Sequence, residues 1–369
     1  MDYFCAATTT RPIFVKTILF FWQTDRGRLT TLLVYLLLSG GVAAIAQTTT
    51  VNCPPTQCVP VTVRRLPLTE PSSASVTPPT STTASSLKKP SFEPQGGNYA
   101  YGSTIKINAD NAPSGSVIER SWDGGRTWTA GTDFTLLWNG TFLARVRQND
   151  QVSAVVQADF GVFYERLFVL GNSITLISPV PDIGWNQTNG MAASAPEKDY
   201  VHLLQNNLLA LNSQLKTSLV GGSGFENKFW EYDFATSLDE HLTDYKPDLV
   251  VVRIGENVSE AEVNSRDNGE IFRQKYNELL NKLTQFSGGR VKVICTTSFW
   301  NNPRSREIII QEAAKRGYPV ADIYGELYNR PDPADFTATQ YNNPGVAAHP
   351  NDRGHSEIAR LIWDKILVP

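Results

Sequence analysis

The sequence predicts an α/β domain in which helices cover both faces of a parallel sheet, preceded by a small β-sandwich module. Five short apolar runs alternate with amphipathic stretches in the C-terminal half of the chain. A tight turn flanked by alternating apolar and polar segments comes before them, and a segment rich in Ser, Thr and Pro comes earlier still. Continuous apolar strands separated by amphipathic helices are typical of parallel sheets that are buried on both faces.

Length and charge narrow the classes of function. The 369 residues leave room for about two domains after processing. The formal net charge is only −3, and the sequence has neither a basic stripe nor a phosphate-binding glycine loop. These properties give no reason to expect a nucleic acid as a partner.

Residues 1–46 have the pattern of an export signal. Leu29 to Ala46 is an apolar run that follows two arginines, and it ends in Ala44-Ile45-Ala46, a small-x-small cleavage pattern. This predicts cleavage before Gln47 and a secreted or periplasmic protein. The run of 18 residues also lies at the lower limit for a membrane span. A membrane-anchored, extracytoplasmic protein therefore stays open as the alternative, and only then is the membrane a partner.

Residues 47–95 are predicted to form an extracytoplasmic linker, because a segment dominated by Ser, Thr and Pro cannot build a buried core. Cys53 and Cys58 lie within it, five positions apart. In an oxidising compartment they could close a small disulfide loop. The sequence leaves open whether they pair.

Residues 96–162 are predicted to form an Ig-like β-sandwich. Thr104 to Asn108 alternates apolar and polar residues, and Phe142 to Arg147 does so in part. Between them, the segment from Trp122 to Trp128 contains Asp-Gly-Gly flanked by strand-forming residues, which indicates a hairpin. The two tryptophans could stack on sugar rings, or one could lie in the core and the other beside a neighbouring strand.

Residues 163–369 carry the alternating pattern of the α/β domain. The apolar runs that predict strands are 167–171, 217–221, 248–254, 291–297 and 319–323. Apolar residues at three- and four-residue spacing predict helices within 198–215, 270–286 and 353–367. In open parallel sheets of this kind, the functional site lies at the carboxyl ends of the strands.

Three polar residues follow these elements in positions suited to acyl chemistry. Ser173 comes directly after the first strand, Asn257 comes after the third, and His349 lies in a loop before the last helix. A serine hydroxyl needs a base before it can act as a nucleophile. An asparagine amide can donate a hydrogen bond to the oxyanion of a tetrahedral intermediate.

The strings around these residues resemble a known family. Gly171-Asn172-Ser173 resembles the first sequence block of the SGNH, or GDSL-like, hydrolases, in which Gly-Asp-Ser is commoner. Gly255-Glu256-Asn257 resembles the third block, and His349-Pro350-Asn351 with Gly354 resembles the last. The resemblance covers roughly residues 165 to 369. It implies a flavodoxin-like three-layer α/β/α fold and a serine esterase that needs neither a metal nor an organic cofactor.

Two histidines compete for the role of the base. His349 precedes a proline in a loop, as in the family's last block. In the alternative register, Asp352 and His355 form the family's Asp-x-x-His pair, but His355 then lies in the first turn of the last helix, where packing is the more natural role. We therefore prefer His349, although this register puts Val346 where the family usually has its acid.

Without that acid, the site is either a Ser–His dyad with an imidazole oriented by a backbone carbonyl, or a triad whose acid comes from elsewhere. Asp352 and Glu226 are the candidates for such an acid.

The predicted oxyanion donors are the backbone N–H of Ser173 and the side chain of Asn257. The resemblance implies a third donor, a glycine N–H from the family's second block, which would lie in the run at 221–224. Gly224 and Gly222 are the candidates for this glycine. The run could instead serve only as a flexible turn.

These features together predict an exported serine esterase that removes acetyl or another small acyl group from a carbohydrate. Asn172 and Trp185 are the predicted substrate contacts, with Trp185 in a long loop that would wall the pocket. Trp185 could equally be packed under that loop. The sequence leaves open two other functions: a non-catalytic glycan-binding or adhesion protein on the same scaffold, and a lipase- or thioesterase-like hydrolase of longer acyl chains.

Overall fold

The computed structural model describes residues 87–368, except 289, 329 and 331, together with four strands nearer the N-terminus. The chain divides into two compact units, Met1–Thr80 and Ser81–Pro369. In the first unit, the strands β1 (Ala7–Thr8), β2 (Val15–Gln23), β3 (Arg28–Leu37) and β4 (Gln47–Asn52) pair antiparallel in sequence order.

Most of the predicted N-terminal features cannot be judged from this unit. The first part of the apolar run of the predicted signal, Leu29 to Leu37, falls in β3, and the rest of the run, 38–46, lies outside the described residues. Cys53 and Cys58 also lie outside them. Among the residues that the structure describes, no helix combines the length and the apolar character needed to cross a bilayer. Export and the linker therefore stay predictions.

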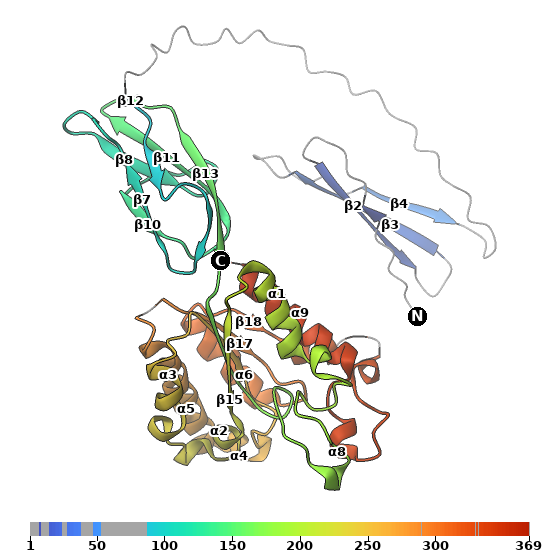
Figure 1. The fold of residues 1–369 in the computed structure, drawn as a ribbon. Coiled ribbons are helices and arrows are strands. Elements are labelled where there is room, and N and C mark those ends of the chain that lie inside the picture. The colour runs from blue at the N-terminus through green and yellow to red at the C-terminus, as the bar shows by residue number, and fades with distance from the viewer. Residues whose placement is uncertain are drawn as a thin grey trace. The chain divides into compact units, whose positions relative to one another are not determined.

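The first part of the second unit is built from two sheets (Figure 1). Their strands pair antiparallel except for the parallel pair β13 and β6. One sheet has the order β10-β7-β5 and contains β5 (Ser91–Glu93), β7 (Thr104–Asn108) and β10 (Asp133–Thr135). The other has the order β6-β13-β11-β8-β9 and contains β6 (Gly97–Ala100), β8 (Val117–Ser121), β9 (Thr129–Ala130), β11 (Gly140–Gln148) and β13 (Val156–Phe163), with β12 (Gln151–Val152) paired to β11. The first strand, β5, thus begins before the predicted module start at residue 96.

Four phenylalanines hold these two sheets together. Phe92 and Phe134 come from one sheet, and Phe142 and Phe160 come from the other. The rings of Phe134 and Phe142 stack with centroids 4.4 Å apart, and Phe160 meets Phe142 edge-on at 5.6 Å. Buried aromatic pairs of this kind dominate the energetics of a small core. Two sheets packed through an apolar layer form a sandwich, while its relation to the Ig-like fold stays a prediction.

The two tryptophans of the predicted hairpin lie outside this core. Trp122 is exposed and meets Trp138 edge-on, with ring centroids 6.3 Å apart. The guanidinium of Arg145, from the neighbouring strand β11, lies 4.1 Å from the ring centroid of Trp128. Trp128 is therefore the predicted partner of a neighbouring strand.

The second part of the unit has a sheet of five parallel strands. They are β14 (Arg166–Gly171), β15 (Lys216–Gly221), β16 (Leu249–Arg253), β17 (Lys292–Thr296) and β18 (Val320–Ala321). Their order is β15-β14-β16-β17-β18, and every pair is parallel. All five apolar runs predicted as strands form these strands. The order is the 2-1-3-4-5 arrangement of doubly wound flavodoxin-like sheets.

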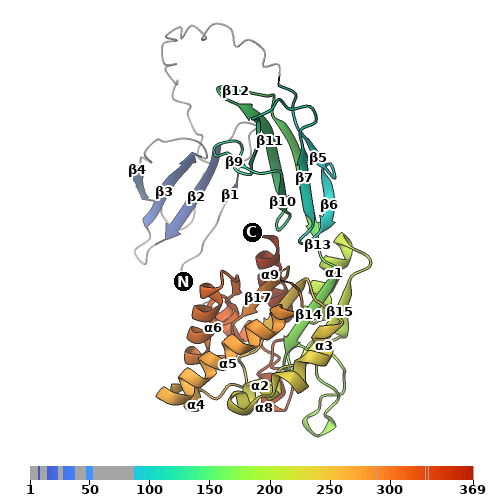
Figure 2. The same ribbon diagram turned by 90° about the vertical axis from the view of Figure 1, so that its left-hand side faces the viewer.

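Helices cover both faces of this sheet. Figure 1 shows α1 (Tyr200–Leu211) and α9 (Asp352–Leu367) side by side on one face, with α5 (Arg266–Gln285) on the opposite side, and Figure 2 shows α6 (Pro303–Lys315) next to α5. The shorter helices are α2 (Ser223–Lys228), α3 (Glu240–Thr243), α4 (Glu260–Asn264), α7 (Ile323–Tyr328) and α8 (Pro344–Ala347). Short 3-10 helices lie at Pro181–Ile183, Pro196–Lys198, Phe229–Glu231 and Pro333–Phe336, and a π-helical segment lies at Ala235–Asp239.

The alternation of strand β14 explains this three-layer arrangement. Leu167 and Val169 belong to the same buried cluster as the apolar faces of α1 and α9, whereas Phe168 and Leu170 belong to the cluster formed with α5 and α6. Successive side chains of a strand point to opposite faces, so a strand that is apolar throughout needs cover on both sides.

The strand order also predicts where the site lies. The chain runs from β14 outward to β15 and then returns to place β16 on the other side of β14. The connections therefore diverge at the carboxyl ends of β14 and β16, and the crevice that this leaves is the usual ligand site of an open α/β sheet.

Candidate active site

Ser173 lies at this crevice, two residues beyond the end of β14. The turn that presents it requires glycine at position 171, since a Cβ there would lie 1.8 Å from Thr175 Oγ1. The Ser173 carbonyl accepts a hydrogen bond of 2.8 Å from Met191 N. This bond ties the serine to the long loop that follows it.

His349 is the histidine that the structure brings to Ser173. The distance from Ser173 Oγ to His349 Nε2 is 2.9 Å, and His349 Nδ1 lies 2.7 Å from the Gly345 carbonyl. Because a carbonyl only accepts, these partners place the imidazole proton on Nδ1 and leave Nε2 free to accept from the serine hydroxyl. Gly345 lies in α8, a four-residue helix capped by the side chain of Asn343. The structure thus pairs Ser173 with His349, and a backbone carbonyl holds the other ring nitrogen.

The acid alternatives for His349 find other partners. Asp352 Oδ1 accepts from Ser194 N at 2.7 Å, and Asp352 Oδ2 accepts from Ser194 Oγ at 2.7 Å and from Lys198 Nζ at 2.9 Å. Asp352 thus ties the long loop to the start of α9. Val346, at the family's acid position, is fully buried. The carboxylate of Asp352 is therefore not the partner of the imidazole.

His355, the competing histidine, is buried in the packing between α1 and α9. Its Nδ1 accepts from Tyr200 N at 3.2 Å, and its Nε2 donates to the Met191 carbonyl at 3.1 Å. Its ring stacks on that of Tyr200, with an interplanar angle of 8°. Both ring nitrogens are satisfied within the fold, so His355 has a structural role.

Asn257 follows β16 and is anchored by Glu226. Its Nδ2 donates a hydrogen bond of 2.7 Å to Glu226 Oε2, although Asn257 itself is exposed. Gly255 has a φ of 138°, a conformation that favours glycine, and its N–H donates to Glu226 Oε1 at 2.6 Å. Glu226 therefore contacts the loop after β16 rather than His349, and it is not the acid of a triad.

The two candidate glycine donors in the run after β15 differ in their hydrogen bonding. Gly222 N donates a hydrogen bond of 2.6 Å to the Gly171 carbonyl, so this N–H is engaged in holding the two strand ends together. Gly224 lies in the first turn of α2, where backbone N–H groups have no partner within the helix. Gly224 is thus the better placed of the two.

Asn172 is a framework residue and not the predicted substrate contact. It is 2% exposed, and its Nδ2 donates to Glu226 Oε1 at 2.9 Å and to Glu256 Oε2 at 2.7 Å. Its Oδ1 accepts from Ile174 N at 3.2 Å. An aspartate at this position would put a third carboxylate between two others, which explains the amide in place of the commoner acid.

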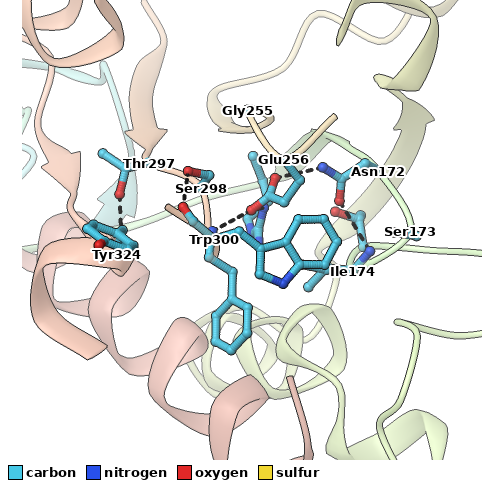
Figure 3. Close-up of polar contacts among 12 residues, drawn as sticks. Asn172, Ser173, Ile174, Gly255, Glu256, Thr297, Ser298, Trp300 and Tyr324 are labelled. Carbon is cyan, nitrogen blue, oxygen red and sulfur yellow. Dashed lines mark hydrogen bonds and ion pairs between the residues drawn. The ribbon is translucent and has the colours of Figure 1, made fainter. Parts of the chain in front are cut away.

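Glu256 connects this amide to the wall of the site (Figure 3). Its Oε1 accepts from Phe299 N at 2.6 Å and lies 2.7 Å from Arg253 Nη1, which is fully buried. Burial lowers the pKa of Arg253, whereas the neighbouring carboxylates of Glu256 and Glu226 raise it. The net result is a pKa above the ordinary value. The buried network thus pairs one guanidinium with the carboxylate of Glu256, with that of Glu226 nearby.

Trp300 is the main residue that the sequence reasoning missed. Its ring meets that of His349 edge-on, with centroids 5.1 Å apart, and its Nε1 donates to the Ala348 carbonyl at 2.9 Å. It also borders a cavity of about 290 Å³, lined by Phe299, Trp300, Asn301, Leu327, Ala334, Phe336 and Thr337. Its position just beyond the fourth strand was the available signal.

Trp185 does not offer a face to substrate. It is 1% exposed and packs in a cluster with Met191, Ala192, Ala338 and Val346. The loop closes over it through a bridge between Val180 and Trp185. The alternative reading, a tryptophan packed under the loop, is therefore the right one.

A metal centre has no candidate among residues 87–368 and the N-terminal strands that the structure describes, since no three His, Cys, Asp or Glu side chains converge there.

No family model and no curated protein matches this chain. Among solved structures, it is similar to a two-domain esterase active on acetylated mannans and co-crystallised with mannopentaose, at 19% identity and a TM-score of 0.36. That match covers 55% of this chain and 50% of the esterase, so this chain spans about half of that protein's length.

Two further matches cover nearly all of the other protein. A lipase/acylhydrolase from Enterococcus faecalis matches at 17% identity and a TM-score of 0.36, over 55% of this chain and 95% of that one. An esterase from a Pseudoalteromonas species matches at 16% identity and a TM-score of 0.33, over 55% and 96%. Three further matched structures are named as a lipolytic protein of the G-D-S-L family or as GDSL-like lipases. At these TM-scores we base the fold on the strand order and the site on its own geometry.

The environment of His349 predicts a pH profile. Burial lowers the pKa of His349 below its ordinary 6.5, Arg253 lowers it further, and the Gly345 carbonyl and Glu256 oppose the shift. The base must be neutral to accept the serine proton, and a lowered pKa keeps it neutral at more acidic pH. We expect kcat/KM for a small ester to reach half its maximum below pH 6.5. A midpoint well above pH 6.5 would contradict this environment.

A structural role for His355 predicts a loss of stability rather than of chemistry. Burial lowers the pKa of His355 to about 4. The folded state favours the neutral ring, so the contribution of His355 to the free energy of unfolding is complete above the unfolded pKa. This contribution is lost as the pH falls from about 6.5 to about 4, by about 3 kcal/mol in all. We expect His355→Ala to lower the free energy of unfolding at pH 7 by about 2–4 kcal/mol and to flatten this dependence, measured by urea unfolding.

The contrasting measurement is the turnover of the folded mutant. His355→Ala should keep kcat within about threefold of the wild type. A folded mutant that has lost all activity would show that His355 takes part in the chemistry.

Proposed function

We propose that this chain is an exported serine esterase that removes acetyl or another small acyl group from a carbohydrate. The distance of 2.9 Å between Ser173 Oγ and His349 Nε2 is the observation that carries the proposal. This Ser–His pair lies at the carboxyl edge of a parallel sheet, next to the end of β16, which Asn257 follows. Export itself rests on the sequence pattern of residues 1–46.

The chemistry follows from the roles that these groups can take. Ser173 Oγ attacks the ester carbonyl and transfers its proton to His349 Nε2. The negative charge that develops on the carbonyl oxygen is stabilised by the amide of Asn257 and by the backbone N–H groups of Ser173 and Gly224. His349 then protonates the leaving alkoxide, and a water molecule hydrolyses the acyl-enzyme by the reverse set of proton transfers. The Gly345 carbonyl orients the imidazole throughout.

The wall beside His349 supports a carbohydrate as the alcohol part of the ester. Trp300 is partly exposed, and aromatic rings offer an apolar face with a polar edge. The polar side chains of Asn301 and Thr337 line the same cavity. A sugar ring has both an apolar face and hydroxyl groups, and this lining matches both.

The same cavity favours one competing function. Phe299, Leu327 and Phe336 make much of its lining apolar. A volume of about 290 Å³ could also accept a longer acyl chain. A series of p-nitrophenyl esters from acetyl to octanoyl separates the two: a kcat/KM that rises with chain length favours the lipase-like function, and one that is greatest for acetyl favours the esterase proposed here.

The nucleophile and the base are tested by single and double substitutions. We expect Ser173→Ala and His349→Ala each to lower kcat for p-nitrophenyl acetate by about 10³-fold or more, and the double mutant to be no slower than the worse single mutant, because the two act as one unit. A fluorophosphonate probe should label wild-type protein at Ser173, shown by peptide mapping.

The matched control is Ser213→Ala, which changes an exposed serine near the amino end of β15. It should hydrolyse the ester and react with the probe as the wild type does. Full activity of folded Ser173→Ala, or an unlabelled and inactive wild type, would refute the enzyme and leave the glycan-binding protein as the better account.

Trp300 is tested by comparing two substrates. We expect Trp300→Ala to raise KM for an acetylated oligosaccharide about 5- to 10-fold through the loss of the aromatic face, with kcat/KM for p-nitrophenyl acetate within about threefold. Trp300→Phe, which keeps a ring beside His349, should lie between Trp300→Ala and the wild type. An equal loss for both substrates would instead make Trp300 a support for His349.

A further inference from the structure

Glu226 lies in α2 and is 1% exposed, yet it contacts both strand ends that form the site. Its Oε1 accepts from Asn172 Nδ2 at 2.9 Å, from Gly255 N at 2.6 Å and from Asn257 N at 3.4 Å. Its Oε2 accepts from Asn257 Nδ2 at 2.7 Å. One carboxylate thus ties the residue next to the nucleophile to the loop after β16.

All of these partners donate, so the carboxylate serves as an acceptor only. The pKa of Glu226 lies above its ordinary value, because burial and the neighbouring Glu256 raise it more than the hydrogen bonds from Gly255, Asn257 and Asn172 lower it. A proton on either oxygen would face a donor and displace one of these bonds. The complete set of hydrogen bonds is therefore available only to the ionised form.

The contact with Asn257 has a directional consequence. An asparagine amide carries two N–H bonds, and its terminal torsion is otherwise broad. When one N–H is held by Glu226 Oε2, the direction of the other is defined. A donor that is oriented before the reaction needs no reorganisation when the oxyanion forms, and this preorganisation is the main source of its catalytic effect.

We propose that Glu226 is a positioning residue that orients the Asn257 amide as the oxyanion donor. This inference rests on the proposed esterase function. Glu226 also lies two residues from Gly224 in the same helix. Its bonds to Asn257 and Asn172 therefore fix the spacing among Gly224, Asn257 and the residue next to the nucleophile. Its effect on the reaction passes through Asn257 and not through His349.

The test is a double-mutant cycle on the hydrolysis of p-nitrophenyl acetate. We expect Asn257→Ala to lower kcat about 10²-fold, and Glu226→Ala to lower it about 30- to 100-fold with KM within about threefold. In the Asn257→Ala background, Glu226→Ala should lower kcat by less than about threefold, because the group that it orients is gone. A purely structural carboxylate would cost the same factor in both backgrounds.

The matched control is Glu312→Ala. Glu312 is also 1% exposed and accepts from Arg273 and Asn277 at 2.6 Å each, but it lies in α6 and contacts α5 instead of the strand ends. This mutant should lose stability while keeping kcat within about threefold. If Glu226→Ala does not fold, Glu226→Gln takes its place in the cycle, since glutamine keeps the shape and sets an NH2 group against the surrounding donors.

The outcomes separate this inference from the proposed function. Suppose that the wild type is active and is labelled at Ser173. If Glu226→Ala then lowers kcat equally in both backgrounds, or leaves kcat unchanged, the positioning role is overturned and the esterase proposal stands. A wild type with neither activity nor labelling would overturn both.

Discussion

The buried pair of carboxylates, Glu226 and Glu256, with the Asn172 amide between them, is the constraint on which the site depends. Two acidic groups this close repel each other and are costly to bury, unless donors satisfy their oxygens. The amide of Asn172 donates to both, and the Arg253 guanidinium adds a positive charge beside Glu256. Through these bonds, the ends of β14 and β16, helix α2 and the segment that carries Trp300 are connected in one network.

In the proposed dyad, His349 is held by a backbone carbonyl, which is a weaker partner than a carboxylate. The Gly345 carbonyl, at 2.7 Å from His349 Nδ1, selects the tautomer that a general base requires. A carbonyl dipole stabilises an imidazolium less than a carboxylate does. The carboxylate that the family usually places beside the histidine is absent from this position, where Val346 is buried. The charged groups of the site are concentrated on the side of Asn257 instead.

Local patterns were sufficient for much of this architecture. The five apolar runs became the strands of the sheet, and the helices at 200–211, 266–285 and 352–367 follow the predicted amphipathic spacing. The preference for His349 over His355 also came from local position, since a residue in the first turn of an apolar helix is placed to pack. Trp185 was misjudged as a substrate contact because exposure within a long loop depends on how the loop folds over itself, which no periodicity reports.

The sequence alone therefore determined the order of the elements, the parallel sheet and the three residues that face its carboxyl edge, because strand and helix periods are written in neighbouring residues. Only the tertiary structure decided which polar groups meet there. Asn172 bonds to Glu226 and Glu256 across 54 and 84 positions of the chain, and Trp300 reaches His349 across a similar span. Such contacts arise when the strand order brings loop ends together, and residue spacing carries no record of that order.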